Sequence, residues 1–179
     1  MLHRNKARIA GLLVALSGAF AAPAVAGTST SNIAVTATVV NNCAFSTTTG
    51  LAFTGYDPVV ANATTALNAT GVLSVQCTKS DSALTVGLGN GNNAVSSQRN
   101  LADTAADKLA YNIYQPASST PGAACAYTTA WTSTATLALT TPTTGKTANS
   151  YNVCGQMPSG QDVPAATTYT DTVVATLTF

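Results

Sequence analysis

The chain ends on a stretch in which apolar or small side chains alternate with threonine: Val173-Val174-Ala175-Thr176-Leu177-Thr178-Phe179. Successive side chains of a β-strand point to opposite faces, so this alternation predicts a strand with one apolar face. That face would carry every second residue: Val173, Ala175, Leu177 and Phe179. Because the strand finishes at the last residue, we expect its edge to remain uncovered.

A second alternating stretch lies near the other end of the chain. Residues 33–39 place apolar side chains at every second position, namely Ile33, Val35, Ala37 and Val39. Such a segment could add a strand to another molecule whose fold lacks one. It could equally be the first strand of its own sandwich, and the periodicity leaves both interpretations open.

Between these ends, segments rich in Thr, Val, Ala and Tyr recur between clusters of Gly, Asn, Pro and Ser, and helical periodicity is nearly absent. This pattern predicts strands at residues 72–77, 84–88, 109–114 and 134–139. Short strands at this spacing, joined by long polar loops, are typical of an antiparallel sandwich. The predicted fold class is therefore all-β, an antiparallel immunoglobulin-like β-sandwich.

Residues 1–26 have the pattern of a secretory signal peptide. Basic residues are followed by an apolar run over 9–22, and Ala24-Val25-Ala26 supplies small residues for cleavage. The run is shorter than the about 20 residues that a membrane-spanning helix needs. We therefore expect an exported protein, with a mature part of the size of one domain.

The mature part contains little of the chemistry that catalysis or nucleic-acid binding requires. Its basic residues number four against six aspartates, so no basic stripe could neutralise phosphates. It contains no histidine and no glutamate, and Asp103 and Asp107 lie in a polar stretch that gives no reason for a raised pKa. The sequence predicts neither an enzyme nor a metal site, a cofactor or a small-molecule substrate.

Four cysteines lie in the exported part: Cys43, Cys77, Cys125 and Cys154. No two are close enough for a C-x-x-C metal site, and the only histidine is His3. In an oxidising compartment this number predicts two disulfides, and spacing leaves all three pairings open.

Several short motifs, in fixed order along nearly the whole mature chain, resemble those of the spore coat protein U family. They are Asn42-Cys43, Phe53, Gly55-Tyr56-Asp57-Pro58, Gly71 through Val75 to Cys77-Thr78, Leu109-Ala110-Tyr111-Asn112-Ile113-Tyr114, Gly155-Gln156-Met157-Pro158-Ser159-Gly160-Gln161 and Tyr169-Thr170-Asp171-Thr172. The family includes major pilins of the archaic chaperone-usher pathway. The glycine that the family usually has shortly before Tyr169 is absent here, which puts the local turn in doubt.

The resemblance implies an incomplete sandwich over 42–179, preceded by a donor-strand extension over 27–41. It places the donor strand at residues 33–39, and it makes the strand ending at Phe179 a wall of the acceptor groove and a chaperone contact. It also implies a Cys43–Cys77 disulfide. Cys154 departs from the family pattern, and Cys125 remains as its partner in a second disulfide.

The resemblance further implies partners and a location. A periplasmic chaperone would lend a strand, and an outer-membrane usher would exchange it for the extension of the next copy or of a related pilin. We therefore expect a structural subunit of a surface pilus or fimbria that supports adhesion or biofilm formation. The alternatives are a tip adhesin and a self-complemented secreted or coat protein.

Overall fold

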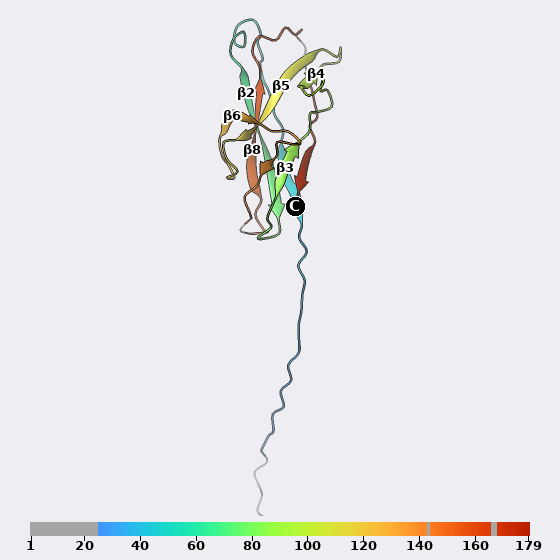
Figure 1. Ribbon diagram of the computed structural model, residues 1–179, viewed down its shortest axis with the longest axis vertical. Coiled ribbons are helices and arrows are strands. Elements are labelled where there is room, and N and C mark those ends of the chain that lie inside the picture. Colours follow the sequence, from blue (N-terminus) through green and yellow to red (C-terminus); the bar gives the residue numbers. More distant parts are fainter. Residues whose placement is uncertain (1–24, 143, 166–167) are drawn as a thin grey trace, which may run out of the picture. The chain divides into compact units, whose positions relative to one another are not determined.

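The computed structural model describes residues 25–142, 144–165 and 168–179 (Figure 1). The chain divides into two units, residues 1–37 and 38–179. In the first unit, the described residues 25–37 carry no secondary structure. Apart from Val25 and Ala26, the predicted signal peptide lies outside the described residues.

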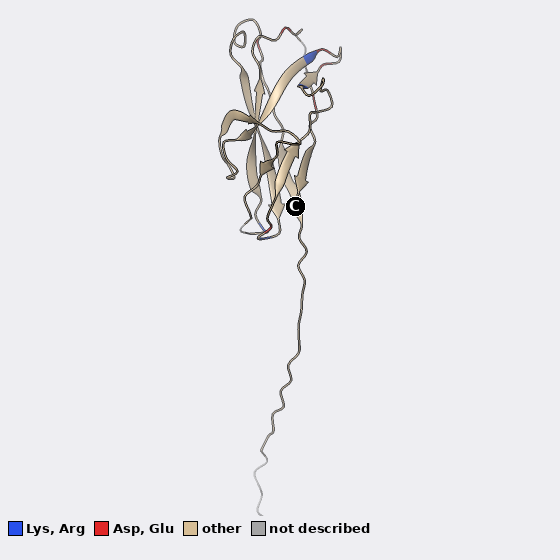
Figure 2. Ribbon diagram, viewed as in Figure 1, with Lys and Arg blue, Asp and Glu red and all other residues tan. Residues whose placement is uncertain are grey.

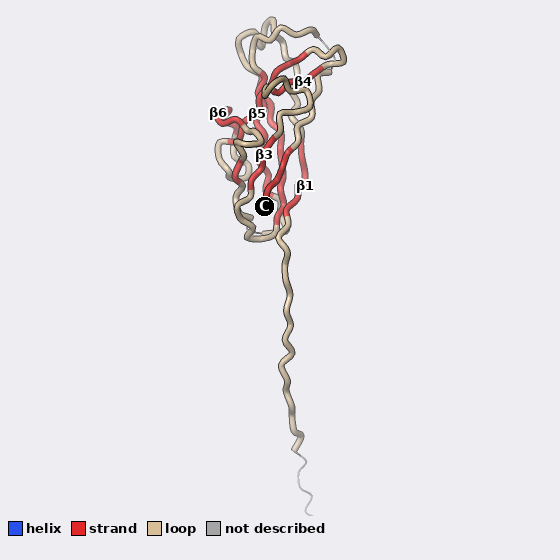
Figure 3. Tube along the Cα trace, turned by 45° about the vertical axis from the view of Figure 1, so that its right-hand side comes forward, coloured by secondary structure: helices blue, strands red, loops and turns tan. Residues whose placement is uncertain are grey.

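The second unit is built from strands, which Figure 3 colours along the trace. They are β1 (Cys43–Thr49), β2 (Leu67–Cys77), β3 (Thr85–Leu88), β4 (Arg99–Ala102), β5 (Lys108–Pro116), β6 (Cys125–Ala130), β7 (Leu137–Ala138), β8 (Asn149–Met157) and β9 (Ala175–Thr178). No described segment forms a helix long and apolar enough to cross a membrane.

The strands form two sheets, in which every strand pair is antiparallel. The large sheet has the order β1-β2-β8-β5-β4, with β6 also paired to β5, and the small sheet has the order β7-β3-β9. Buried side chains from both sheets form one core, with Leu73 and Tyr151 from the large sheet against Val86 and Leu137 from the small one. The predicted antiparallel immunoglobulin-like sandwich is confirmed.

Alternation in the sequence located the strands that have one buried face. In β5, Leu109, Tyr111 and Ile113 are buried while the intervening residues are half-buried. The segments 72–77, 84–88, 109–114 and 173–179 overlap β2, β3, β5 and β9. The strand predicted at 134–139 is shorter than expected, because only Leu137–Ala138 pair with β3.

The pattern missed β1, β4, β6 and β8, although β8 lies between β2 and β5 in the large sheet. Polar residues of β8 interrupt the alternation of apolar and polar side chains, and their side chains form hydrogen bonds within the fold. Ser150 Oγ lies 2.7 Å from Ser74 Oγ on β2, and Asn152 Nδ2 donates to the Ala123 carbonyl at 2.9 Å. These hydrogen bonds let a polar segment occupy the middle of a sheet.

Two disulfides join strands of the large sheet. Cys43 on β1 is bonded to Cys77 on β2, directly opposite in the ladder, and Cys125 on β6 is bonded to Cys154 on β8. Both predicted pairs are confirmed. By the chain-entropy model each closed loop, with sequence separations of 34 and 29, stabilises the fold by about 3 to 4 kcal/mol.

Candidate functional site: a groove between two free strand edges

The sheet order leaves two neighbouring strands with free edges. β1 ends the large sheet and β9 ends the small one, and among the described residues neither has a second strand partner. The two strands contact each other across the gap between the sheets. Each free edge presents backbone N–H and C=O groups with which a further strand could pair.

A groove of about 310 Å³ lies between these edges. The end of β1, at Thr48 and Thr49, forms one rim, and Asp171 and Thr172 at the start of the final segment form part of the other. Most of the wall is apolar and includes Leu51, Leu73, Leu88, Ile113, Val153 and Val173. Few charged residues lie in the strands of this domain, as the colours of the ribbon in Figure 2 show. The groove therefore suits an apolar, extended segment.

The final strand forms the groove wall through its register with β3. Leu88 pairs with Ala175 and Val86 with Leu177, so the apolar face of β9 turns toward the core. Of the residues predicted for this wall, Val173 and Ala175 line the groove and Leu177 packs against the core. Phe179 is 53% exposed.

Asp171 fixes the entry into β9. Its Oδ1 accepts hydrogen bonds from the backbone N–H groups of Asn92 (2.9 Å) and Asn93 (3.1 Å), and its Oδ2 accepts one from the Tyr111 hydroxyl (2.7 Å). Gly91 has φ +88° and lies so close to this carboxylate that a Cβ would collide with it. Burial, followed by the hydrogen bond to Asp171, raises the pKa of Tyr111.

Arg99 holds the end of β3, the strand that supports β9. Its guanidinium is buried and donates to the carbonyl oxygens of Leu88 (3.0 Å), Gly89 (2.7 Å) and Trp131 (2.8 Å). Burial lowers the pKa of Arg99. Trp131 is fully buried, and its indole N–H donates to the Val86 carbonyl at 2.8 Å. These contacts give the small sheet a fixed position beside the groove.

The segment after β1 forms part of the groove wall, and it fits because of a glycine in β8. A Cβ at Gly155 would lie 2.7 Å from Phe53 and 2.8 Å from Leu51, so a larger residue would displace both side chains. Phe53 also packs on Tyr111, with ring centroids 6.1 Å apart. Phe53 and Gly155 belong to the motifs that resemble the family, so the resemblance pointed to two residues that shape this wall. Periodicity alone does not single out either residue.

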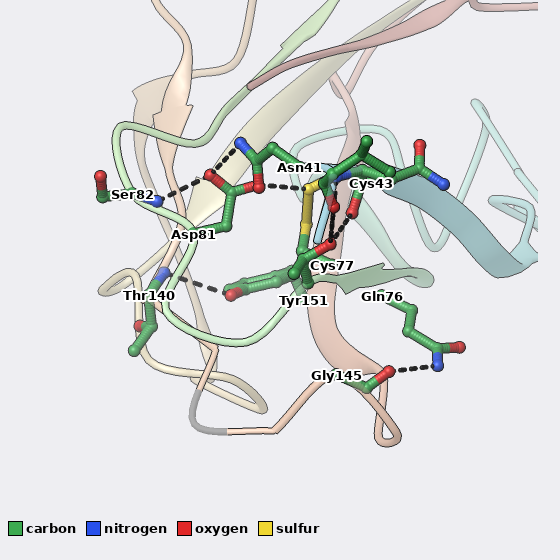
Figure 4. Close-up of a disulfide and its surroundings, with 12 residues drawn as sticks. Asn41, Cys43, Gln76, Cys77, Asp81, Ser82, Thr140, Gly145 and Tyr151 are labelled. Carbon is green, nitrogen blue, oxygen red and sulfur yellow. Dashed lines mark hydrogen bonds between the residues drawn. A yellow bond between two sulfur atoms is a disulfide. The ribbon is translucent and has the colours of Figure 1, made fainter. Parts of the chain in front are cut away.

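The start of the domain is held at the Cys43–Cys77 disulfide (Figure 4). Asn41 Nδ2 donates to Asp81 Oδ1 at 2.8 Å, and the Thr78 hydroxyl donates to the carbonyl oxygens of Val40 (3.3 Å) and Asn42 (3.2 Å). Sequence reasoning missed Asp81, a buried carboxylate that follows β2 in a polar stretch.

Asp81 Oδ2 also lies 3.1 Å from Cys43 Sγ. The sulfur carries no hydrogen in a disulfide, so this approach is a contact rather than a hydrogen bond. Cys43, Cys77 and Asp81 cluster closely enough to suggest a metal site. Since both cysteines are bonded to each other, neither offers the thiolate that a metal would require, and the cluster is structural.

The predicted donor residues have no strand partner among the described residues. Ile33, Val35 and Val39 are 86%, 88% and 84% exposed, Ala37 is exposed, and residues 27–42 carry no secondary structure. Residues 33–39 form no strand in the structure, and the first strand begins at Cys43. The donor assignment itself stays a prediction.

Asp103 and Asp107 occupy the turn between β4 and β5. Asp103 Oδ1 accepts from the N–H groups of Ala105 and Asp107, both at 2.9 Å. The carboxylate thus closes its own turn, as turn aspartates commonly do. The geometry supports the interpretation of these aspartates as loop residues rather than a catalytic pair.

Comparison with known proteins relates most of this chain to one family. The family model described as Spore Coat Protein U domain matches residues 29–176. A curated relative, Protein U of Myxococcus xanthus, is 36% identical over 189 residues, covering 99% of this chain and 100% of that protein.

A solved structure with a similar fold is a chain of the chaperone–tip adhesion subunit pre-assembly complex from the archaic chaperone-usher Csu pili of Acinetobacter baumannii. It has 20% identity and a TM-score of 0.46, and the match covers 79% of this chain and 41% of that one.

Proposed function

The chain belongs to the spore coat protein U domain family, and on this premise we propose that it is a structural subunit of a surface pilus. Subunits would join when residues 33–39 of one copy add a strand to the groove of another. The subunit would be exported, receive a strand from a periplasmic chaperone and pass through an outer-membrane usher. The assembled filament would support adhesion or biofilm formation at the cell surface.

The observation that carries this proposal is the groove between the free edges of β1 and β9. A strand placed there could hydrogen-bond to the free edge of β9, and it would cover the apolar wall at Leu73, Ile113 and Val153. Strand addition of this kind takes affinity from main-chain hydrogen bonds and specificity from alternate side chains.

The N-terminal segment has the complementary chemistry. Its apolar side chains recur at every second position and are almost fully exposed. Burying a large aliphatic side chain such as Ile33, Val35 or Val39 contributes about 1.5 to 3 kcal/mol. The opposite face offers Ala34, Thr36 and Thr38, which can remain in water.

A donor at one end and an acceptor groove elsewhere on the same chain form a heterologous contact. Such a contact repeats without closing when the rotation does not bring the copies into a ring, and it then yields a filament. Neighbouring copies of this chain, or related subunits, are therefore the proposed permanent partners, and the chaperone is a temporary one.

The test compares two aspartate variants on opposite faces of the donor segment. Val35→Asp would bring an unpaired carboxylate into an apolar groove and should abolish polymers, whereas Thr36→Asp should leave them intact. The mature protein is recovered from the periplasm with a candidate chaperone and is analysed by size exclusion and an unheated gel. Polymers of normal yield from Val35→Asp would refute the donor assignment.

A second function is favoured by the match to Protein U over the full length of both chains. Here the chain would be a self-contained secreted or coat domain that fills its own groove. It predicts a stable monomer that needs no chaperone, and Val35→Asp would then lower the monomer's stability rather than its polymer yield.

A further inference from the structure

The donor segment continues into the folded domain without a free linker. Val40, the residue that follows the last donor position, already accepts the Thr78 hydrogen bond, and Asn41 is tied to Asp81. Consecutive Cα atoms lie about 3.8 Å apart. If Val39 of one copy lies in the groove of a neighbour, the domain that carries it must therefore touch that neighbour.

The direction of the added strand decides where the two domains meet. Every strand pair in the fold is antiparallel, and an antiparallel pair is slightly more stable per residue than a parallel one. A donor that runs antiparallel to β9 ends at the start of β9. That end of the groove is bounded by Leu51 and Val173.

The apolar surface continues beyond this end of the groove. A second hollow of about 650 Å³ shares Leu51, Phe53 and Leu101 with the groove and extends to Pro58 and Val59. Val59 and Val60 are 82% and 77% exposed. Two adjacent exposed valines at the edge of an apolar hollow are a surface suited to another protein.

The turn that presents these valines is held in one conformation. Asp57 Oδ1 accepts from the N–H groups of Val59 (2.9 Å) and Val60 (3.1 Å), and Asn62 N–H donates to the Asp57 carbonyl at 2.7 Å. The hydrogen bonds to Val59 and Val60 lower the pKa of Asp57. A turn that is already ordered loses little conformational entropy when it docks.

We propose that the Val59–Val60 turn is a second contact between neighbouring copies of this chain, and that it packs against the exposed Val40 of the copy that donates the strand. Val40 is 77% exposed and directly follows the last donor residue, so it would lie next to the end of the neighbour's groove. The inference rests on the proposed strand exchange and adds a surface that the exchange does not itself require.

A cysteine pair tests the contact in the assembled polymer. In the double variant Val40→Cys with Val59→Cys, oxidation should link neighbouring copies, so that a ladder survives boiling in detergent without reductant and disappears with reductant. The control pairs Val40→Cys with Ser119→Cys, an exposed loop residue that lies toward the Cys77 end of β2. This control should form polymers that boiling separates.

The outcomes distinguish this inference from the proposed function. Polymers on the unheated gel with no boiling-resistant ladder, or with equal ladders in both pairs, would overturn the Val59–Val60 contact while leaving strand exchange intact. Absence of polymers from the unmodified protein would overturn both. A ladder that the Val59 pair forms and the control lacks supports the contact.

A second variant avoids added thiols. Val59→Ser with Val60→Ser keeps the turn, because its hydrogen bonds to Asp57 come from backbone groups. We expect polymers at normal yield that dissociate at a temperature several degrees lower than the unmodified ones. An unchanged dissociation temperature would show that the valines are not buried between copies.

Discussion

The two edges of the small sheet differ in length and in what lies beside them. β7 contributes only Leu137–Ala138 to its edge, and the turn before it is closed by Ala135 N–H donating to Thr132 Oγ1 at 2.8 Å. β9 contributes Ala175–Thr178, with a groove of about 310 Å³ next to its start.

The difference indicates which edge can accept a strand. A two-residue edge offers too few backbone groups to hold another chain, and short edge strands are a common protection against unwanted pairing. β9 has no such protection among the described residues, and its apolar face lies against the groove. Exposure of this edge fits a domain that is built to be completed by a partner.

The largest expected effect is on polymer yield, and it is tested by two separate variants that place an aspartate on the β9 edge or on the β7 edge. Ala175→Asp puts a carboxylate in the groove wall, where an added strand would bury it without a partner, so we expect polymers to be abolished. Ala138→Asp, on an exposed position of β7 in the same sheet, should leave polymer yield unchanged. Unheated gels of both variants check this, and similar yields would contradict the distinction between the edges.

A smaller effect, on the stability of the domain, is expected from a change beside β3, the strand that pairs with both β7 and β9. Trp131→Phe removes the indole N–H that donates to the Val86 carbonyl and shortens a fully buried side chain. The free energy of unfolding should fall by about 1 to 3 kcal/mol. Urea unfolding of the mature protein measures it, and Tyr151→Phe serves as a matched control because its hydroxyl bond to Thr140 is only part-buried.

Alkaline pH offers a third test, at the entry to β9. The pKa of Tyr111 is raised in the folded state, so its contribution to stability is complete below about pH 10, the ordinary pKa of tyrosine. It is lost as pH rises above that value, because the unfolded chain releases this proton first. Tyr111→Phe should therefore lose less stability between pH 9 and about pH 11 than the unmodified protein.

Thermal unfolding at several pH values measures this difference. Tyr111→Phe should also be less stable at neutral pH by about 0.5 to 1.5 kcal/mol, since it lacks the hydrogen bond to Asp171. Identical pH dependence in the two proteins would contradict the role of this hydroxyl.

The smallest effect is expected at the closed edge. Gln115 Nε2 donates to the Ala135 carbonyl at 2.9 Å, an exposed bond in the turn before β7. Gln115→Ala should lower the free energy of unfolding by about 0.5 kcal/mol and leave polymer yield unchanged. A loss of polymers in this variant would show that the β7 edge takes part in assembly.

Alternation in the sequence predicted the strands that bury only one of their two faces. β5 and β9 alternate because one face packs on the core and the other does not. β8 was missed because its polar residues Ser150 and Asn152 hydrogen-bond to Ser74 and Ala123 on distant segments, which a local pattern cannot show.

The candidate site was predictable only in part, for the same reason. Val173 and Ala175 were identified from alternation, but the opposing wall comes from Leu51, Leu73 and Ile113, which lie far from them in the sequence. The Cys43–Cys77 disulfide followed from the family resemblance and the Cys125–Cys154 disulfide by elimination, while spacing alone had left the pairing open. Asp81 carried no local signal, because its partner Asn41 is 40 residues away.

The central claim is that the groove beside β9 accepts residues 33–39 in one register. The most direct measurement mixes a labelled synthetic peptide of residues 31–40 with the mature Val35→Asp protein, which should not donate but should accept, and follows the complex on an unheated gel. We predict that the unmodified peptide and a Thr36→Asp peptide bind, and that a Val35→Asp peptide does not. Equal binding of all three peptides, or no binding of the unmodified one, would contradict the account.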